Sequence, residues 1–181
     1  MILLVSAPLW PLIALAIKLE SPGPVFFHQR RRGRYQTTID VLKFRTMTVM
    51  EDGADVRQAV QGDPRVTRIG RILRRTSLDE LPQIFNVIRG EMSLVGPRPH
   101  ALVHDEEFSR VLEIYPDRHQ MKPGITGLAQ VSGLRGPTTA PGSIDARVAA
   151  DLAYVQHWSL WLDMQILAKT FYAVMSGKNA D

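Results

Sequence analysis

The segment RRTSLDELPQ, residues 74–83, places two adjacent carboxylates, Asp79 and Glu80, shortly after a pair of arginines. A carboxylate can attack a phosphate or bind a divalent cation, and an attack on an anionic phosphate requires neighbouring positive charge. Ser77 followed three residues later by Glu80 also matches a capping box, which would make both acids ordinary helix-start residues. Pro82 favours a helix start nearer Asp79. The segment alone therefore allows both a structural and a catalytic interpretation.

Arginines gather in two segments, HQRRRGRYQ (residues 28–36) and DPRVTRIGRILRRTS (residues 63–77), although the whole chain has only 22 basic against 18 acidic residues. Such clusters favour an anionic partner, which could be a nucleic acid, a lipid headgroup or a nucleotide, over a merely solvated face. Aromatic residues do not interleave with the arginines and no nucleic-acid reading motif is present, so no nucleic acid is expected as a partner. The chain has no cysteine, which excludes disulfides and thiolate metal sites.

The first 17 residues are uncharged and strongly apolar, barely as long as the roughly 20 residues that a membrane-spanning helix needs. A signal peptide fits poorly, because no basic segment precedes the apolar run. Pro8 and Pro11 fall inside the run and favour a bent, re-entrant helix over a tilted spanning helix or a buried core helix. The basic cluster that follows favours the cytoplasmic side and contact with anionic lipid.

Beyond this element, apolar residues recur at helical spacing over residues 63–88, 104–120 and 145–175. Residues 37–47 are rich in β-branched side chains and predict a short strand. Segments rich in glycine and proline predict a turn at 20–29 and loops at 90–100 and 122–143. Tyr154, Trp158 and Trp161 would share one face of the last helix, either as core packing or as an interfacial belt.

The pattern predicts a mostly α fold with minor β. Residues 1–20 would form a re-entrant, proline-broken membrane helix, and residues 21–181 a cytoplasmic, membrane-associated helical catalytic domain.

Five motifs, in order and at matching spacing, give the chain a wider resemblance: SPGPVFF, KFRTM, DPRVTRIGRILRRTSLDELPQIFNVIRGEMSLVGPRPH, KPGITGLAQVSG and DLAYVQHWSLWLD. Together they resemble the bacterial sugar transferases, monotopic phosphoglycosyl transferases that move a sugar 1-phosphate onto a polyprenyl phosphate. The likeness is strongest to undecaprenyl-phosphate glucose or galactose phosphotransferases of exopolysaccharide synthesis. It covers nearly the whole chain.

The resemblance implies catalytic roles for Asp79 and Glu80. In the family scheme the aspartate attacks the β-phosphate of a UDP-sugar, UMP leaves, and the lipid phosphate then attacks the sugar-phosphoryl enzyme. Mg²⁺ is required, with the acidic pair Asp79 and Glu80 near it. A helix start would suit such chemistry, because it favours negative charge.

The same matching implies phosphate or nucleotide binding by Arg74, Arg98, Arg45 and Thr46, and places Asp151 on a family acid near the site. The alternatives are a loop clamp for Arg98, a solvated helix face for Arg74 and a helix-surface acid for Asp151.

Pro8 matches the family's membrane-helix break, although Ala7 stands where a serine is common and Ser6 lies one residue earlier. The expected partners are a UDP-sugar (UDP-glucose or UDP-galactose), undecaprenyl phosphate and anionic lipid of the inner leaflet, and a homo-oligomer is left open. The expected location is the cytoplasmic face of the bacterial inner membrane. The competing hypotheses are a catalytically inert membrane adaptor with the same fold and, less favoured, a basic nucleic-acid-binding module.

Overall fold

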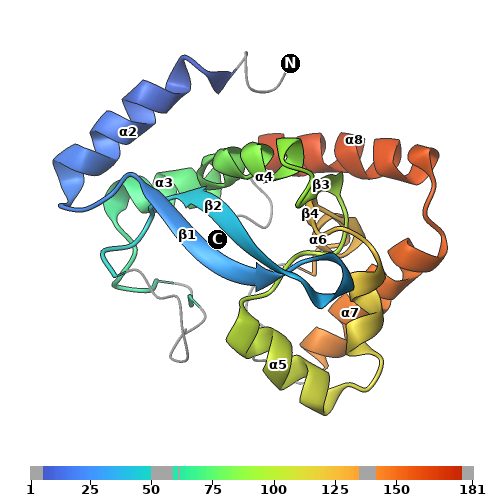
Figure 1. The fold of residues 1–181 in the computed structure, drawn as a ribbon. Coiled ribbons are helices and arrows are strands. Elements are labelled where there is room, and N and C mark those ends of the chain that lie inside the picture. Colours follow the sequence, from blue (N-terminus) through green and yellow to red (C-terminus); the bar gives the residue numbers. More distant parts are fainter. Residues whose placement is uncertain (1–5, 50–58, 61, 135–141, 177–181) are drawn as a thin grey trace.

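An antiparallel hairpin of strands β1 (Phe26–Arg32) and β2 (Thr38–Phe44) lies at the centre of the fold, with helices around it (Figure 1). Figure 1 presents a computed structural model, and the structure describes residues 6–49, 59–60, 62–134 and 142–176. A second, parallel pair is formed by β3 (Ser93–Val95) and β4 (Gly124–Thr126). The predicted class, mostly α with minor β, is confirmed.

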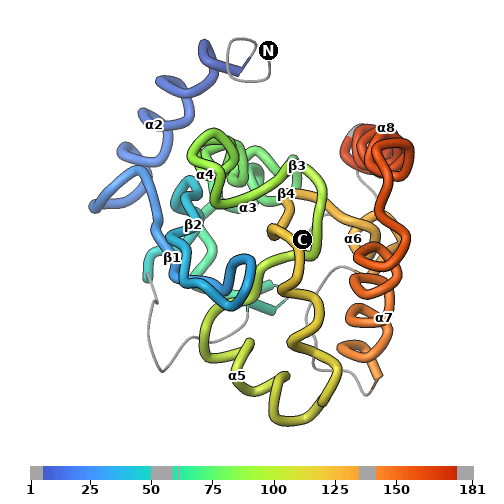
Figure 2. Tube along the Cα trace, turned by 45° about the vertical axis from the view of Figure 1, so that its right-hand side comes forward, coloured from blue at the N-terminus to red at the C-terminus, as the bar shows by residue number. Residues whose placement is uncertain are grey.

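The helices and short 3₁₀ segments are α2 (Leu9–Glu20), η1 (Arg34–Gln36), α3 (Arg68–Arg75), η2 (Leu78–Gln83), α4 (Ile84–Ile88), α5 (Leu102–Val111), η3 (Tyr115–Gln120), α6 (Leu128–Val131), α7 (Ser143–Gln156) and α8 (Leu160–Ser176). In Figure 1, α3, α4 and α8 follow one another along the upper side, and α2 projects beyond this row. Figure 2 gives the same arrangement from another side, with α2 and α8 at opposite ends of the row.

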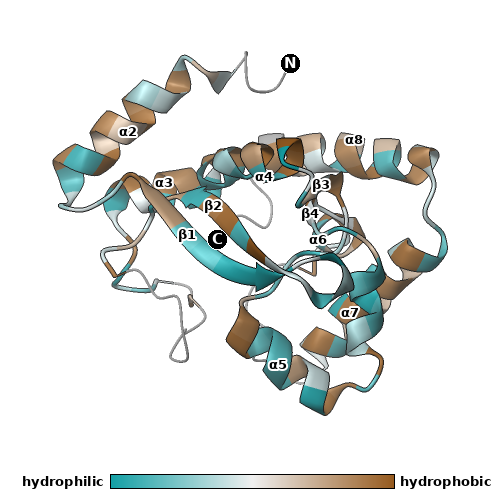
Figure 3. Cartoon of the chain, in the orientation of Figure 1, coloured by the Kyte–Doolittle hydropathy of each residue, from teal (hydrophilic) through white to brown (hydrophobic). Residues whose placement is uncertain are grey.

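The hairpin presents two different faces because side chains alternate along a strand. On β2, Ile39 and Val41 are buried on one face, and Lys43 follows them in the same phase. Arg31 pairs directly with Ile39 and therefore lies on that face too. Figure 3 shows β1 changing from apolar at its start to strongly polar at its arginines. One face of the hairpin thus carries cations beside buried aliphatic residues.

Helix α2 begins directly after Pro8, with Ala7 and Pro8 in a turn and Ser6 in helical conformation before them. The indole of Trp10 donates a hydrogen bond to the Ser6 hydroxyl across this break (3.2 Å). Pro11 falls within the first helical turn, where its missing N–H costs little. The structure therefore places a helix boundary at Pro8, while its membrane role stays a prediction.

One side of α2 packs on the body of the protein: Ile13 and Ile17 join Phe44 and Leu73 in a buried cluster. The leucines at positions 9, 12, 15 and 19 are instead exposed. Within the residues that the structure describes, no helix combines the length and the apolar character that crossing a membrane requires.

The carboxylate of Glu20 links the end of α2 to the start of α3. It accepts hydrogen bonds from the backbone N–H groups of Arg68 (2.6 Å) and Ile69 (2.9 Å), which have no partner within the helix. Thr67 caps the same end through its hydroxyl, which accepts from the N–H of Gly70. The side chains of Glu20 and Thr67 therefore fix the position of the first turn of α3.

Several local predictions were wrong. The predicted turn at 20–29 overlaps the start of β1, and the predicted loops at 90–100 and 122–143 contain β3, β4 and α6. The predicted strand at 37–47 is confirmed as β2.

The predicted final helix is two helices, α7 and α8, separated at residues 157–159. Tyr154 is consequently buried, whereas Trp158 and Trp161 are exposed, so the three aromatic residues do not form one stripe.

Candidate active site

Helix α3 and η2 meet at Ser77, whose backbone is in the left-handed region (φ 56°). The Ser77 side chain caps no helix; its backbone carbonyl instead accepts from the N–H of Glu80 (3.3 Å). The predicted capping box is therefore wrong. The left-handed residue redirects the chain after the basic end of α3, so that η2 turns Asp79 inward.

Glu80 is shared by two cations from different parts of the fold. Its carboxylate accepts from the ammonium of Lys43 on β2 (2.7 Å) and from both terminal nitrogens of Arg98 (2.5 and 3.2 Å). Burial alone would raise the pKa of Glu80, but Arg98 and Lys43 outweigh it and hold the pKa well below its ordinary value. Glu80 is therefore a firmly ionised carboxylate that joins η2, β2 and the loop carrying Arg98.

Asp79 has a contrasting environment. The residue is only 7% exposed, and within the described parts of the chain its carboxylate has no hydrogen-bond partner. Burial raises its pKa, Lys43, Arg74 and Arg98 oppose the increase, and the adjacent Glu80 adds to it. A buried carboxylate with free lone pairs, next to cations, can act as a nucleophile or as a ligand of a cation.

Arg74 lies at the end of α3, close enough to Asp79 to oppose the rise of its pKa. It is partly buried, and in the described part of the structure its guanidinium donates no hydrogen bond. Arg98 still has donors beyond the two nitrogens on Glu80. The structure thus brings together four of the predicted residues, Asp79, Glu80, Arg74 and Arg98, and leaves two guanidinium groups able to receive an anion.

Arg45 is used differently from the phosphate-binding role that the resemblance implies. Its guanidinium is buried and donates to the carbonyls of Ser21 (2.7 Å) and Pro22 and, more weakly, of Ile17 (3.5 Å), which caps the end of α2. The Thr46 carbonyl accepts from the N–H of Thr67, at the start of α3. Arg45 thus binds the end of α2 and the Thr46 carbonyl binds the start of α3. A phosphate-binding role for either residue stays a prediction.

Asp151 is not the helix-surface acid that was one alternative. It is 1% exposed and pairs with the equally buried Arg118, which donates to it through Nη2 (2.5 Å) and Nε (3.1 Å). The same Nη2 donates to the backbone carbonyl of Arg98 (2.6 Å). Asp151 thus lies behind the loop that carries Arg98.

Lys43 was missed by the sequence reasoning, which chose its neighbours Arg45 and Thr46 in KFRTM. The signal was the strand period, because Lys43 falls in phase with the buried Ile39 and Val41. A lysine on the buried face of a strand needs an acidic partner, and Glu80 provides it.

The donor set for a divalent cation is small. Within the described residues, no group of three or more histidine, aspartate or glutamate side chains could hold a metal ion. The free carboxylate of Asp79 fits Mg²⁺, which is commonly bound through one or two carboxylates and substrate phosphates. Both oxygens of Glu80 are engaged by Lys43 and Arg98, so Glu80 fits only after releasing one of them. A joint Asp79–Glu80 site stays a prediction.

Residues 1–177 match the family described as bacterial sugar transferase. The chain is 55% identical over 174 residues, 96% of its length, to a UDP-glucose:undecaprenyl-phosphate glucose-1-phosphate transferase of Caulobacter vibrioides. It is 51% identical over 180 residues, 99% of its length, to the Escherichia coli protein of the same name. The chain spans 65% of the first relative and 39% of the second. It covers 86% of the exopolysaccharide production protein PSS of Rhizobium leguminosarum, at 51% identity over 93% of this chain.

Replacing Glu80 by Gln should lower the free energy of unfolding by about 2–4 kcal/mol at neutral pH, because Lys43 and Arg98 then lose their counter-charge. The exposed pair of Glu106 and Arg32 offers a control, and Glu106→Gln should cost less than about 0.5 kcal/mol. Urea unfolding of both variants measures the difference.

The pH dependence follows from the direction of the Glu80 shift. Because its pKa is depressed in the folded state, the stabilisation is complete above the unfolded value of about 4.3 and is lost as the pH falls towards the folded value. The gap between wild type and Glu80→Gln should therefore narrow below about pH 4. A gap that is constant with pH would contradict the ion-pair assignment.

Proposed function

The chain belongs to the bacterial sugar transferase family, and from this premise we propose that it transfers a hexose 1-phosphate from a UDP-sugar to undecaprenyl phosphate. The products are a polyprenyl-diphosphate sugar and UMP. The observation that carries the proposal is the buried carboxylate of Asp79, which accepts no hydrogen bond from the residues that the structure describes and has Arg74 and Arg98 close by. An inert adaptor would have no need of a buried carboxylate placed among arginines.

The first proposed step is attack by an Asp79 carboxylate oxygen on the β-phosphorus of the UDP-sugar. A phosphorus–oxygen bond forms to Asp79, the bond to the bridging oxygen breaks, and UMP leaves with that oxygen. In the second step, an oxygen of undecaprenyl phosphate attacks the same phosphorus and releases the carboxylate. Burial of Asp79 favours attack, because a poorly solvated carboxylate loses little hydration on approaching the phosphorus.

The cations around Asp79 have separate tasks in this proposal. Arg74, without a hydrogen-bonded partner in the described structure, can bind the diphosphate, and Arg98 can bind a phosphate with the donors not used on Glu80. Lys43 and Arg98 keep Glu80 ionised and in place. Mg²⁺, bound at Asp79 and the diphosphate, would neutralise charge on the phosphate oxygens and the leaving group.

We propose UDP-glucose as the first sugar donor to test, with UDP-galactose as the alternative. The names of the Caulobacter vibrioides and Escherichia coli relatives specify UDP-glucose. The more distant Aeromonas hydrophila relative, 40% identical, is named for UDP-N-acetylgalactosamine, so the fold is compatible with other sugars. The proposed place of the reaction is the first membrane step of exopolysaccharide synthesis.

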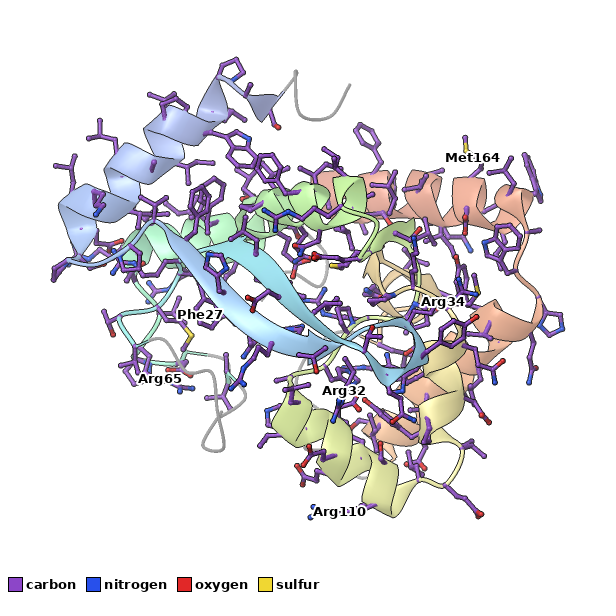
Figure 4. All side chains as sticks on the ribbon, viewed as in Figure 1. Phe27, Arg32, Arg34, Arg65, Arg110 and Met164 are labelled. Atoms are coloured by element: carbon purple, nitrogen blue, oxygen red, sulfur yellow. The ribbon has the colours of Figure 1, made fainter. Side chains whose placement is uncertain are left out.

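We further propose that the protein lies on the cytoplasmic face of the inner membrane, with residues 1–20 re-entrant. The exposed leucines of α2 support this, as does an apolar outer face on α8 that includes Leu160, Trp161, Met164 and Phe171. Met164 points away from the body on the upper side of Figure 4, the side on which α2 also lies. A row of apolar side chains on one side of the molecule suits the headgroup boundary of a bilayer.

Replacing Asp79 by Asn should abolish UMP release, because an amide cannot attack phosphorus, while the protein stays folded. UMP release from UDP-glucose and UDP-galactose would be measured with Mg²⁺ and undecaprenyl phosphate. Wild type incubated without lipid should gain the mass of one hexose phosphate. Asp145→Asn, an exposed change on α7, is the control and should retain full activity. Retained activity of Asp79→Asn would remove Asp79 as the nucleophile.

Removing divalent metal should lower the rate of UMP release by at least about 100-fold, because only arginines then neutralise the charge of the diphosphate. The measurement is the same assay in excess chelator, followed by restoration with Mg²⁺. Full activity in the chelator would mean that the cationic side chains suffice and would eliminate the magnesium requirement.

Charge placed on the outer face of α8 should weaken membrane binding. Trp161→Asp combined with Met164→Asp should reduce co-sedimentation with vesicles containing anionic lipid by about tenfold or more, since each carboxylate opposes insertion by a few kcal/mol. Lys169→Gln, an exposed change on the same helix, is the control and should change binding by less than about twofold. Unchanged binding of the double variant would show that α8 does not contact the lipid.

A further inference from the structure

The loop between β3 and α5, residues 96–101, is held by arginines on two sides. Nη2 of Arg118 donates to the carbonyl of Arg98 (2.6 Å), and Nη1 of Arg31 donates to the carbonyl of Pro99 (2.5 Å). Two successive carbonyls of one loop are thus bound by guanidinium groups from η3 and from β1. The first of these carbonyls belongs to Arg98, whose side chain pairs with Glu80.

Arg31 reaches the loop because of its position in the hairpin. It lies on the same face as Lys43, and its backbone forms an isolated antiparallel bridge with Ala101. The side chain of Gln29 orients it by accepting from Nε (3.1 Å) and Nη2 (2.6 Å). Within the described residues Arg31 has no carboxylate within salt-bridge distance, so its hydrogen bonds go to neutral oxygens.

Arg118 is anchored more deeply than Arg31. Besides Asp151, it contacts the hydroxyl of Tyr115 (3.0 Å) and Nδ1 of His100 (3.1 Å) through Nη1. Its side chain is 1% exposed and every one of its nitrogens has a partner. No donor of Arg118 is therefore free to bind a substrate.

We propose that Arg31 and Arg118 are positioning residues, which clamp the 96–101 loop so that Arg98 is aimed at Glu80 and at the phosphate of the substrate. Only the part of this proposal that concerns the substrate phosphate rests on the proposed function. The clamp on Arg98 concerns the fold and does not depend on it. Arg98 donates to Glu80 through both terminal nitrogens, and this geometry depends on where the Arg98 backbone lies. Fixing the Arg98 carbonyl and the carbonyl that follows it, that of Pro99, provides that constraint.

A double-mutant cycle on the free energy of unfolding tests the clamp without any substrate. If Arg31 aligns Arg98 with Glu80, the cost of Glu80→Gln should fall by at least about half when Arg31 is already Gln. Arg32→Gln is the matched control, because Arg32 is the next residue on β1 and contacts Glu106 instead. Its combination with Glu80→Gln should be additive. Additivity for Arg31 as well would overturn the proposal.

A second cycle links the clamp to ligand binding. The probe is UDP, which carries no sugar to transfer, with Mg²⁺ and the full chain. Arg31→Gln should weaken UDP binding about tenfold in the wild-type background but less than about twofold when Arg98 is Gln. Arg31→Lys, which can still donate to the Pro99 carbonyl, should recover part of the loss. An equal loss in both backgrounds would mean that Arg31 binds the nucleotide directly, against a positioning role.

The two cycles separate the possible failures. If wild type does not bind UDP, the proposed function fails, and the unfolding cycle still decides whether the clamp exists.

Arg118→Lys tests the other half of the clamp, because a lysine cannot bind Asp151, His100 and the Arg98 carbonyl together. Arg118→Lys should reduce the loss of unfolding free energy caused by Glu80→Gln, as Arg31→Gln does. If neither arginine is coupled to Glu80, the loop is held by its prolines and the clamp is wrong.

Discussion

The site depends on one shared carboxylate. Glu80 joins three segments that are distant in sequence, because Lys43 comes from β2, Arg98 from the 96–101 loop and Glu80 itself from η2. Charge pairs with little solvent are costly to form and more costly to leave half-made. Losing any one of the three would expose the other two to that cost. The geometry around Asp79 is therefore maintained by its neighbour.

The division of labour between the two acids follows from this arrangement. Lys43 and Arg98 form hydrogen-bonded ion pairs with Glu80. They act on Asp79, the preceding residue, only through longer-range electrostatic attraction. Adjacent carboxylates thus acquire pKa values that move in opposite directions, one through ion pairing and the other through burial. Opposite shifts in neighbouring groups are a feature of sites built for chemistry rather than for stability alone.

The family resemblance selected Asp79, Glu80, Arg74 and Arg98, which the structure brings together, because matching motifs to a family does not depend on the details of the fold. Sequence reasoning failed where a role depends on a contact distant in sequence. Nothing local indicates that Arg45 caps α2, since its carbonyl partners lie more than twenty residues earlier. The capping box failed because Ser77 adopts a left-handed backbone, which a serine rarely does. The strands β3 and β4 were missed because each has three residues, too few for a period to be seen.

Two helix caps connect α2 to the segments around the candidate site. Arg45 places a cation on the carbonyl of Ser21, the C-cap residue of α2, and Glu20 places an anion on the first N–H groups of α3. Each charge has the sign that the helix dipole favours. Helix α3 in turn ends at Arg75, two residues before Ser77 turns the chain towards Asp79. Because Glu20 at the end of α2 binds the first N–H groups of α3, the position of α2 determines the position of the start of α3. If α2 lies at a membrane as we propose, α3 would therefore link the depth of α2 to the position of Asp79 relative to a lipid phosphate.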